Sequence, residues 1–348
     1  MNRKHACLAA LAAAFAAPAA LAQTANPVTL YGRIYVTAES VEAKGGTSPR
    51  PRRNRVEDQS SLLGVRGTED LGGGLAAFFQ LETGFSPDDT AGTFARRNSA
   101  VGLRGAWGAI SMGRWDTPFK QTQVGSVDPW TDLQIGDITG AAIRQGGFSQ
   151  RAQNVVQYWS PTMAGFQLKA MYGANEGRTA TANPSLVSAS LSWEAGENTS
   201  FSYAYEKHND SIGATATAGV DEEGHGISGE YRIGPVKLSG QYGEYERTNA
   251  TKQKSYQAGI QYYLGKHQFI LTYSASKDGG ATTAAAQPEC DLTAVGYRYN
   301  FTRRTFLIAS YAKVENDTGN LCNFGSNGLT ITEGQDPQGY SLGLRHVF

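Results

Sequence analysis

The chain of 348 residues contains few cysteines and histidines, and it lacks a long apolar run after its first 22 residues. Cys290 and Cys322 are the only cysteines beyond that point, and neither has a second cysteine or a histidine nearby at metal-ligand spacing. No later stretch approaches the ~20 apolar residues that a membrane-spanning helix needs. The mean hydropathy is −0.39. These absences exclude a helical membrane protein and predict no metal site.

Motifs of catalysis and phosphate binding are also absent. There is no G-x-S-x-G elbow at a strand-to-helix junction, and no Ser-His-Asp order stands out. Gly72-Gly-Gly74 lies between expected strands with no helix to receive a phosphate, so a tight turn explains it. Asp221-Glu-Glu223 is interpreted as a solvated loop tip. The sequence therefore predicts neither an enzyme nor a cofactor.

The charges are balanced, with 31 basic and 31 acidic residues. Two of the basic residues and none of the acidic ones fall within residues 1–22, so the rest of the chain is slightly acidic. Because nucleic-acid-binding proteins carry basic patches, the sequence predicts no nucleic-acid partner.

The first 22 residues have the form of a secretory signal peptide. Arg3 and Lys4 form a basic head, and Ala6–Ala22 is an apolar stretch of mostly alanine and leucine. Ala20-Leu21-Ala22 has the small-x-small form that signal peptidase cuts, just before Gln23. We expect residues 1–22 to be removed and residues 23–348 to form the exported protein.

Alternation of apolar and polar residues is the main pattern that is present. The last nine residues place Tyr340, Leu342 and Leu344 on one face of a strand, and Phe348 ends the chain on an aromatic residue. This ending is typical of β-barrels in Gram-negative outer membranes, where it serves as an assembly signal. Such a barrel can have a soluble-looking hydropathy, because only every second residue must be apolar.

The same period-2 pattern, bounded by turn residues, predicts an all-β chain of sixteen strands. Their expected spans are 28–41, 60–69, 75–85, 97–105, 109–115, 153–160, 166–174, 186–194, 199–208, 225–233, 236–246, 254–264, 268–276, 292–301, 305–315 and 338–348.

The links between these strands alternate in length. Seven are short, such as Asp70–Gly74 and Gly234–Pro235, and eight are long and polar, such as 42–59 and 316–337. Bacterial barrels have short periplasmic turns and long external loops, which places both termini of this chain in the periplasm. A secreted sandwich or propeller would also alternate, but it lacks this regular change of link length.

An antiparallel barrel of about sixteen strands is too wide for its wall side chains to fill, so water fills the interior. The largest inserted segment then becomes the functional one. Residues 116–152 form the longest link, and loops of this length are usually functional. If the loop folds inward, it brings acidic groups into the lumen, namely Asp116, Asp128, Asp132 and Asp137.

Cys290 and Cys322 both lie in loop-like sequence. In an oxidising compartment they could form one disulfide, although two free thiols fit the spacing equally well.

Five segments spread along the chain form a specific combination: Val28–Arg33, Ser61–Leu75, Phe79–Phe85, Gly113–Pro118 and Leu342–Phe348. With these segments the chain resembles the trimeric general porins of Gram-negative outer membranes, in particular the β-proteobacterial branch. The resemblance implies sixteen strands, a homotrimer and a third loop folded into the pore.

The resemblance also implies a cluster of arginines on the wall opposite the third loop. Arg33, Arg66 and Arg104 match that cluster best, and Arg151 is a further candidate. The family often carries an arginine before a tyrosine on the sixth strand, where this chain has Gln157–Tyr158. One basic group of the family pattern is therefore missing.

The combined interpretation is an outer-membrane porin, a water-filled channel for passive diffusion of small hydrophilic solutes and ions. Charged groups at the third loop are expected to set a weak ion selectivity. Expected partners are outer-membrane lipids, further copies of the chain in a homotrimer, and the barrel-assembly machinery, which would recognise the strand ending at Phe348. The alternatives are a substrate-specific channel and an outer-membrane barrel lipase.

Overall fold

The fold is known from a computed structural model. It describes residues 28–88, 92–123, 127–130, 134–138, 147–174, 176–250, 252–278, 289–318, 320–325 and 328–348. The expected signal peptide and Asp132 lie outside the described residues.

Twenty strands and one short helix are present in this part of the chain. They are β1 (Thr29–Gly45), β2 (Arg50–Asp58), β3 (Leu62–Gly72), β4 (Leu75–Phe85), β5 (Gly92–Thr93), β6 (Ser99–Gly105), β7 (Gly108–Asp116), α2 (Pro118–Gln123), β8 (Arg151–Trp159), β9 (Phe166–Ala174), β10 (Ser185–Ala195), β11 (Thr199–Asn209), β12 (Ser211–Ile212), β13 (Thr215–Ala216), β14 (Glu222–Ile233), β15 (Val236–Arg247), β16 (Gln253–Leu264), β17 (His267–Asp278), β18 (Cys290–Asn300), β19 (Thr305–Asn316) and β20 (Gln335–Val347).

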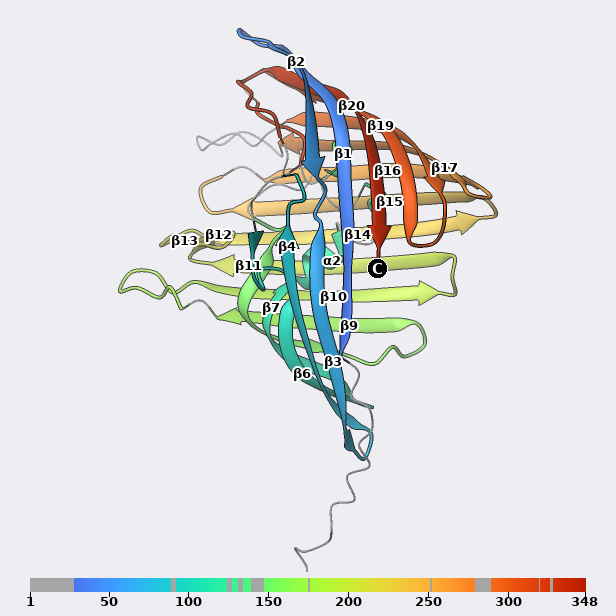
Figure 1. The fold of residues 1–348 in the computed structure, drawn as a ribbon. Coiled ribbons are helices and arrows are strands. Elements are labelled where there is room, and N and C mark those ends of the chain that lie inside the picture. Colours follow the sequence, from blue (N-terminus) through green and yellow to red (C-terminus); the bar gives the residue numbers. More distant parts are fainter. Residues whose placement is uncertain are drawn as a thin grey trace, which may run out of the picture.

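All the strands except β12 and β13 form one antiparallel sheet that closes on itself (Figure 1). β2 and β3 follow each other along β1, separated by a break at which Ser60 has a positive φ of 59°. β5 and β6 follow each other along β4 in the same way. The sheet is thus a closed barrel of sixteen strands, as the alternation predicted.

The first and last strands close the barrel. β1 pairs with β20 from Arg33 opposite Val347 to Gly45 opposite Gln335. Phe348 extends this ladder, because its N–H and carbonyl both bond the backbone of Gly32, at 2.9 and 3.1 Å. The aromatic ring fills the space above Gly32, where an added Cβ would lie 2.6 Å from it. The terminal residue is therefore part of the seam, and the pairing that closes the barrel removes the exposed edges of the sheet.

The two faces of the wall differ as the sequence predicted. On β20, Tyr340, Leu342 and Leu344 are more than half exposed on the outer face, whereas Ser341 between them is 5% exposed. On β16, Ile260 is exposed outside while Gln257 and Gln261 are buried inside. An apolar outer face and a polar interior are what a barrel in lipid requires. No helix within the described ranges is long and apolar enough to cross a membrane.

The prediction of a long loop at 42–59 was wrong. β1 continues to Gly45 and β2 occupies Arg50–Asp58, so this segment is a hairpin that prolongs the wall. Cross-strand ion pairs stabilise it, from Arg55 to Glu39 and from Arg52 to Glu42, each at 2.7 Å. A hairpin held by charges has no apolar alternation, and the sequence pattern missed it for that reason.

Candidate functional site

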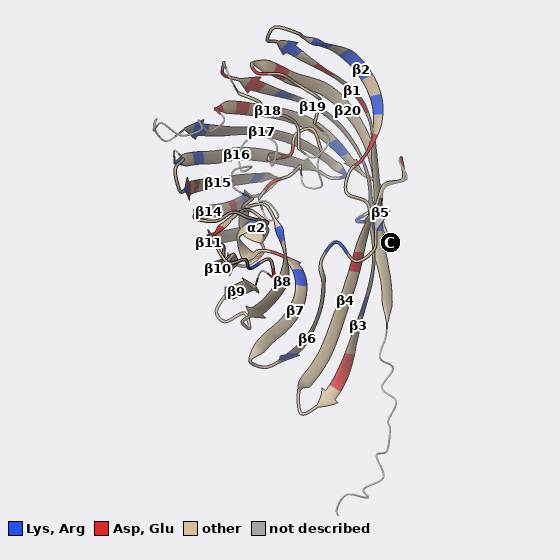
Figure 2. Ribbon diagram, turned by 90° about the vertical axis from the view of Figure 1, so that its left-hand side faces the viewer, with Lys and Arg blue, Asp and Glu red and all other residues tan. Residues whose placement is uncertain are grey.

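The link between β7 and β8, residues 117–150, is called the third loop here. Its described residues, 117–123, 127–130, 134–138 and 147–150, lie against the inner face of the barrel. Figure 2 shows its helix α2 inside the curve of the sheet. The Phe119 N–H donates to Ser188 Oγ on β10 at 3.1 Å, and Ser228 Oγ on β14 donates to the Thr122 carbonyl at 2.8 Å. Small polar wall residues thus satisfy the backbone groups of a helix too short to do so itself.

Further along, the loop is anchored by a buried tryptophan. Trp130 is fully buried, and its indole N–H donates to Thr272 Oγ1 on β17 at 2.7 Å. Gly296 on β18 makes room for the ring, since a Cβ there would lie 2.4 Å from it. The described parts of the loop therefore cover the inner wall at several places between β10 and β18.

Two of the predicted loop acids lie on the covered side of the loop. Asp128 and Asp137 are 5% and 2% exposed. Asp128 accepts hydrogen bonds from the Trp130 and Ile138 N–H groups, at 3.1 and 3.2 Å, and from Gln257 on β16 at 3.3 Å. Burial, and next the neighbouring Asp137, raise the pKa of the Asp128 carboxyl. Asp128 organises the loop against the wall.

Asp116 joins the loop to the basic side of the lumen. It lies at the end of β7 and forms ion pairs with Lys120 of α2, at 2.9 Å, and with Arg151 at 3.1 Å. Asn98 donates to its carboxylate at 3.0 Å and accepts from Arg151 Nε at 2.7 Å. Asp116 and Arg151, both predicted, are thus brought together at the root of the third loop.

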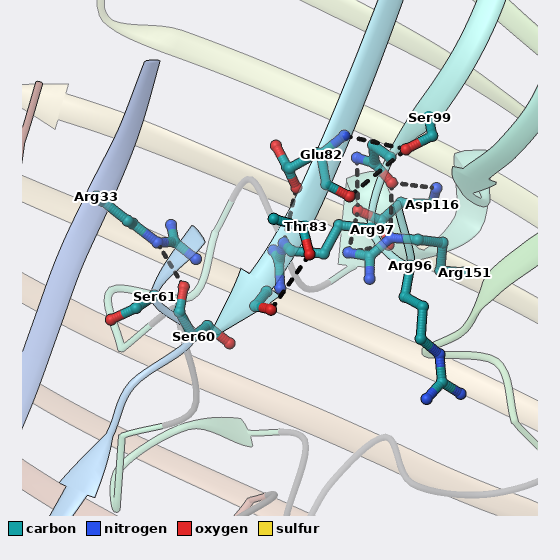
Figure 3. A network of polar contacts seen from close by, with 12 residues as sticks. Arg33, Ser60, Ser61, Glu82, Thr83, Arg96, Arg97, Ser99, Asp116 and Arg151 are labelled. Carbon is teal, nitrogen blue, oxygen red and sulfur yellow. Dashed lines mark hydrogen bonds and ion pairs between the residues drawn. The ribbon is translucent and has the colours of Figure 1, made fainter. Parts of the chain in front are cut away.

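Arginines from neighbouring strands continue this network along the wall (Figure 3). Arg97 Nε donates to Glu82 on β4 at 2.7 Å, and Tyr31 on β1 donates to the same carboxylate at 3.2 Å. Arg33 Nε donates to the Ser60 carbonyl at 2.9 Å, in the short link between strands β2 and β3.

Arg66 and Arg104 lie further toward the short turns. The Arg66 guanidinium lies 5.0 Å from the centre of the Tyr31 ring. Arg104 donates to Thr68 at 3.2 Å, one residue before the Gly105–Gly108 turn. Both are exposed on the wet face of the wall. The structure pairs Arg151 with Asp116 at the loop root. It places Arg33 beside Ser60 and Arg66 beside Tyr31 on the neighbouring wall, and Arg104 nearest to a short turn.

Sequence reasoning missed Arg97 as a member of this wall. Arg97 follows Arg96 just before β6. Two adjacent arginines at the start of a strand were the sequence feature that could have indicated a basic group on this wall.

The sequence also missed a buried charged cluster near the other end of the loop. His208 lies between Glu206 and Glu222, at 2.9 and 3.0 Å, and all three side chains are fully buried. Arg247 completes it with an ion pair to Glu222 at 2.6 Å. The ring of Phe148, from the returning third loop, stacks on His208 at 4.8 Å. The cluster is formed by residues of three different strands, so no short sequence motif indicates it.

Cys290 on β18 and Cys322 are joined by a disulfide. Cys322 belongs to the link between β19 and β20, which the sequence interpretation treated as a polar external loop. Its apolar residues Cys322, Phe324 and Leu329 are instead buried in one cluster with Trp130 of the third loop. The last link thus packs on the same inner wall as the third loop. No group of three or more His, Cys, Asp or Glu residues in the described chain suits a metal ion.

Comparison with known proteins gives consistent matches along almost the whole chain. A family model described as Gram-negative porin matches residues 8–319. Outer membrane porin protein 32 of Delftia acidovorans is 29% identical over 98% of this chain and 99% of its own length. Major outer membrane protein P.IB of Neisseria gonorrhoeae is 28% identical, covering 84% of this chain and 89% of its own.

One solved structure adds a match in three dimensions. The anion-selective porin from Comamonas acidovorans has a TM-score of 0.76 and 26% identity, over 93% of this chain and 100% of that chain.

A closed barrel of sixteen strands with an apolar outer face and a charged, polar lumen defines a pore-forming protein of a bacterial outer membrane. This chain belongs to the Gram-negative porin family. It is an outer-membrane porin, a channel through which small hydrophilic solutes and ions diffuse passively.

Proposed function

We propose that the third loop narrows this channel and that the arginines facing it give the pore a weak preference for anions. The observation that carries the proposal is the distribution of charge around the loop. Arg33 and Arg66 lie on the wall that the loop leaves uncovered, and Arg97 beside them is ion-paired with Glu82. The described loop acids are paired or turned away, since Asp116 is held by Lys120 and Arg151, and Asp128 and Asp137 are buried.

The physical reason is the local sum of charge. A guanidinium remains protonated at every physiological pH, whereas a paired or buried carboxyl contributes little field to the water beside it. Anions therefore concentrate at the narrow part of the lumen. Among the predicted acidic residues, Asp132 stays a candidate for the opposing negative charge. The similar Comamonas protein is itself an anion-selective porin, which supports the same direction.

The test is the reversal potential of the purified porin in planar bilayers under a KCl gradient. An R33Q/R66Q double variant should lose most of its anion preference. Arg104→Gln is the matched control, because it removes the same charge from the same wall beside a short turn. The double variant should shift the potential several times more than the control. An unchanged ratio of anion to cation permeability in the double variant would remove the assignment.

Raising the salt concentration should weaken the preference in the unaltered protein. The Debye length falls from about 10 Å at 0.1 M to about 3 Å at 1 M, so charges on the wall act over less of the lumen. A preference independent of salt would point to a site that binds anions directly.

We further propose that residues 1–22 are cleaved as a signal peptide and that the mature chain assembles as a homotrimer in contact with outer-membrane lipids. One structural neighbour, OmpT of Vibrio cholerae, is known in a trimer form, which supports this assembly. The strand ending at Phe348 would be recognised by the barrel-assembly machinery. Mass spectrometry of the mature protein and stepwise closure of single channels in threes would test the first two points.

A further inference from the structure

An apolar groove of about 660 Å³ lies on the outer face of the barrel, across strands β9 to β15. Gly229 on β14 and Gly240 on β15 form its floor, because they are opposite each other in the sheet and neither carries a side chain. Gly240 leaves the most room. Within 4 Å of a Cβ built there, the only described atom outside its own segment is the Gln257 carbonyl oxygen, at 3.6 Å. The outer surface is therefore hollowed at these two glycines.

Large apolar side chains border the glycines on the same face. Ile227 and Tyr242, each two residues from a glycine, are opposite each other on one side. Tyr231 and Leu238 are paired in the same way on the other side. These four side chains are between 36% and 56% exposed. The groove is thus a furrow between two apolar ridges, and it is open toward the surroundings of the barrel.

The groove rises from the short turns toward the middle of the wall. One row of the sheet runs from Phe166 through Trp193, Phe201 and Gly229 to Gly240, each directly opposite the next. Phe166 is the first residue of β9 after a short turn, whereas Gly240 is the fifth residue of β15. With neighbouring strands ~4.8 Å apart, a row across five strands spans about 19 Å.

Aromatic rings mark the end of the groove nearest the short turns. Trp193 stacks on Phe201 with ring centres 6.3 Å apart, and the Phe166 ring lies 6.1 Å from that of Trp193. In bacterial barrels such rings form a girdle at the membrane interface, and the short turns are periplasmic. The groove therefore begins at the headgroups of the periplasmic leaflet and continues to the depth of the acyl chains.

We propose that this groove holds one acyl chain of a phospholipid from the periplasmic leaflet. The inference rests on the proposed contact with outer-membrane lipids and assigns one lipid a fixed place on the wall. An acyl chain is long, thin and flexible, and it runs from the interface toward the middle of the bilayer, as the groove does. In the furrow it buries apolar surface on the ridges and on the glycine floor. A second barrel presents a rigid wall, which would contact the two ridges and leave the furrow between them empty.

Native mass spectrometry of the purified porin in mild detergent, titrated with palmitoyl-oleoyl phosphatidylethanolamine, tests the site. The unaltered protein should bind one phospholipid tightly per chain. Gly240→Leu should raise the half-saturating concentration at least tenfold, because the new side chain fills the furrow and the burial of only two methylene groups corresponds to about a factor of ten. Gly240 does not have a positive φ, so the backbone accepts leucine without strain.

Ala309→Leu is the matched control. Ala309 is likewise the fifth residue after a short turn, on β19, and it is exposed on the outer face opposite Leu342. Its replacement adds a similar bulk to the outer wall away from the groove and should leave the titration unchanged. Phospholipid with brominated acyl chains gives a second measurement, because bromine quenches tryptophan fluorescence on contact. The saturable part of the quenching should be lost in Trp193→Phe and weakened in Gly240→Leu.

Equal titration curves for the unaltered porin, Gly240→Leu and Ala309→Leu would overturn the proposal. Loss of trimers in Gly240→Leu without loss of phospholipid would also overturn it and would assign the groove to a second copy of the chain. Normal conductance in each variant shows that the barrel has folded. A porin that inserts into phospholipid vesicles but binds no discrete phospholipid would keep the proposed lipid contact and lose only this site.

Discussion

The two halves of the inner wall use different chemistry. The wall of β1, β3, β4 and β6, which the third loop leaves open, carries charged side chains such as Arg33, Arg66 and Glu82. The wall from β10 to β18, which the loop covers, offers mostly uncharged groups to it, such as Ser188, Gln257 and Thr272. The same barrel thus has a charged wet wall and a neutral dry one.

The difference follows from the cost of removing charge from water. A hydroxyl or amide loses little when one hydrogen bond to the loop replaces one to water, whereas a buried ion needs full pairing. The loop can therefore pack closely on serine and glutamine. A buried exception on the covered wall is the cluster of Glu206, His208, Glu222 and Arg247, in which every ion has an opposite neighbour. That exception offers the strongest test of the comparison.

The largest expected effect comes from breaking this cluster. His208→Ala would leave Glu206 without its partner in a fully buried site, and breaking a buried ion pair costs ~3–5 kcal/mol of unfolding free energy. The matched control is His225→Ala, because His225 pairs with Glu223 but is about half exposed, and should change stability little. Urea unfolding of the porin in lipid vesicles measures both. Equal losses in the two variants would show that burial does not distinguish the walls.

The disulfide comes next in size. It joins β18 to the last link, whose residues Phe324 and Leu329 pack on the covered wall. A C290S/C322S variant should lose ~2–4 kcal/mol, the usual value for removing a cross-link. The single-channel conductance should rise, because the released link no longer packs inside the barrel. Unfolding with and without reductant checks this, and the double variant should not respond to reductant at all.

A smaller loss is expected from Thr272→Val. The change keeps the shape of the side chain and removes the acceptor of the Trp130 indole N–H, which then stays buried without a partner. Such a group costs ~1–3 kcal/mol. The control is Thr293→Val on β18, whose side chain is exposed on the outer face. We expect noisier open-channel current only in the Thr272 variant, and quiet current there would mean that Trp130 is not an anchor.

Most of the barrel could be predicted from the sequence, because each strand carries its own signal. The period of two is local, and the closing strand ending at Phe348 was visible in nine residues. The hairpin of β2 was missed because it is stabilised by ion pairs of Arg52 and Arg55 with residues of the neighbouring strand β1. Such cross-strand pairing has no signature within a single segment.

The candidate site was less predictable. Asp116 and Arg151 were named from the sequence, and the structure brings them together at the root of the third loop. No local pattern indicates that Asp128 turns toward the wall, because its hydrogen-bond partner Gln257 is 129 residues away. The His208 cluster escaped detection for the same reason. Residues whose partners are distant in the sequence can be identified only from the folded structure.

The smallest effect on stability is expected on the open wall, from Arg97→Gln. Arg97 is ion-paired with Glu82 at 2.7 Å, but both side chains reach the lumen water, with 21% and 10% of their surface exposed. A pair that keeps some contact with water costs less to break than a fully buried one, so the loss of stability should be smaller than in the His208 variant. Selectivity should nevertheless move toward cations, because Glu82 keeps its negative charge after the arginine has gone. On this wall, a substitution would then change ion selectivity with a smaller change in stability. On the covered wall, a loss of stability also alters the current, because it loosens the third loop. A variant of Arg97 that unfolds as easily as the His208 variant would show that ion pairs of the open wall also stabilise the barrel, and the contrast between the two walls would disappear.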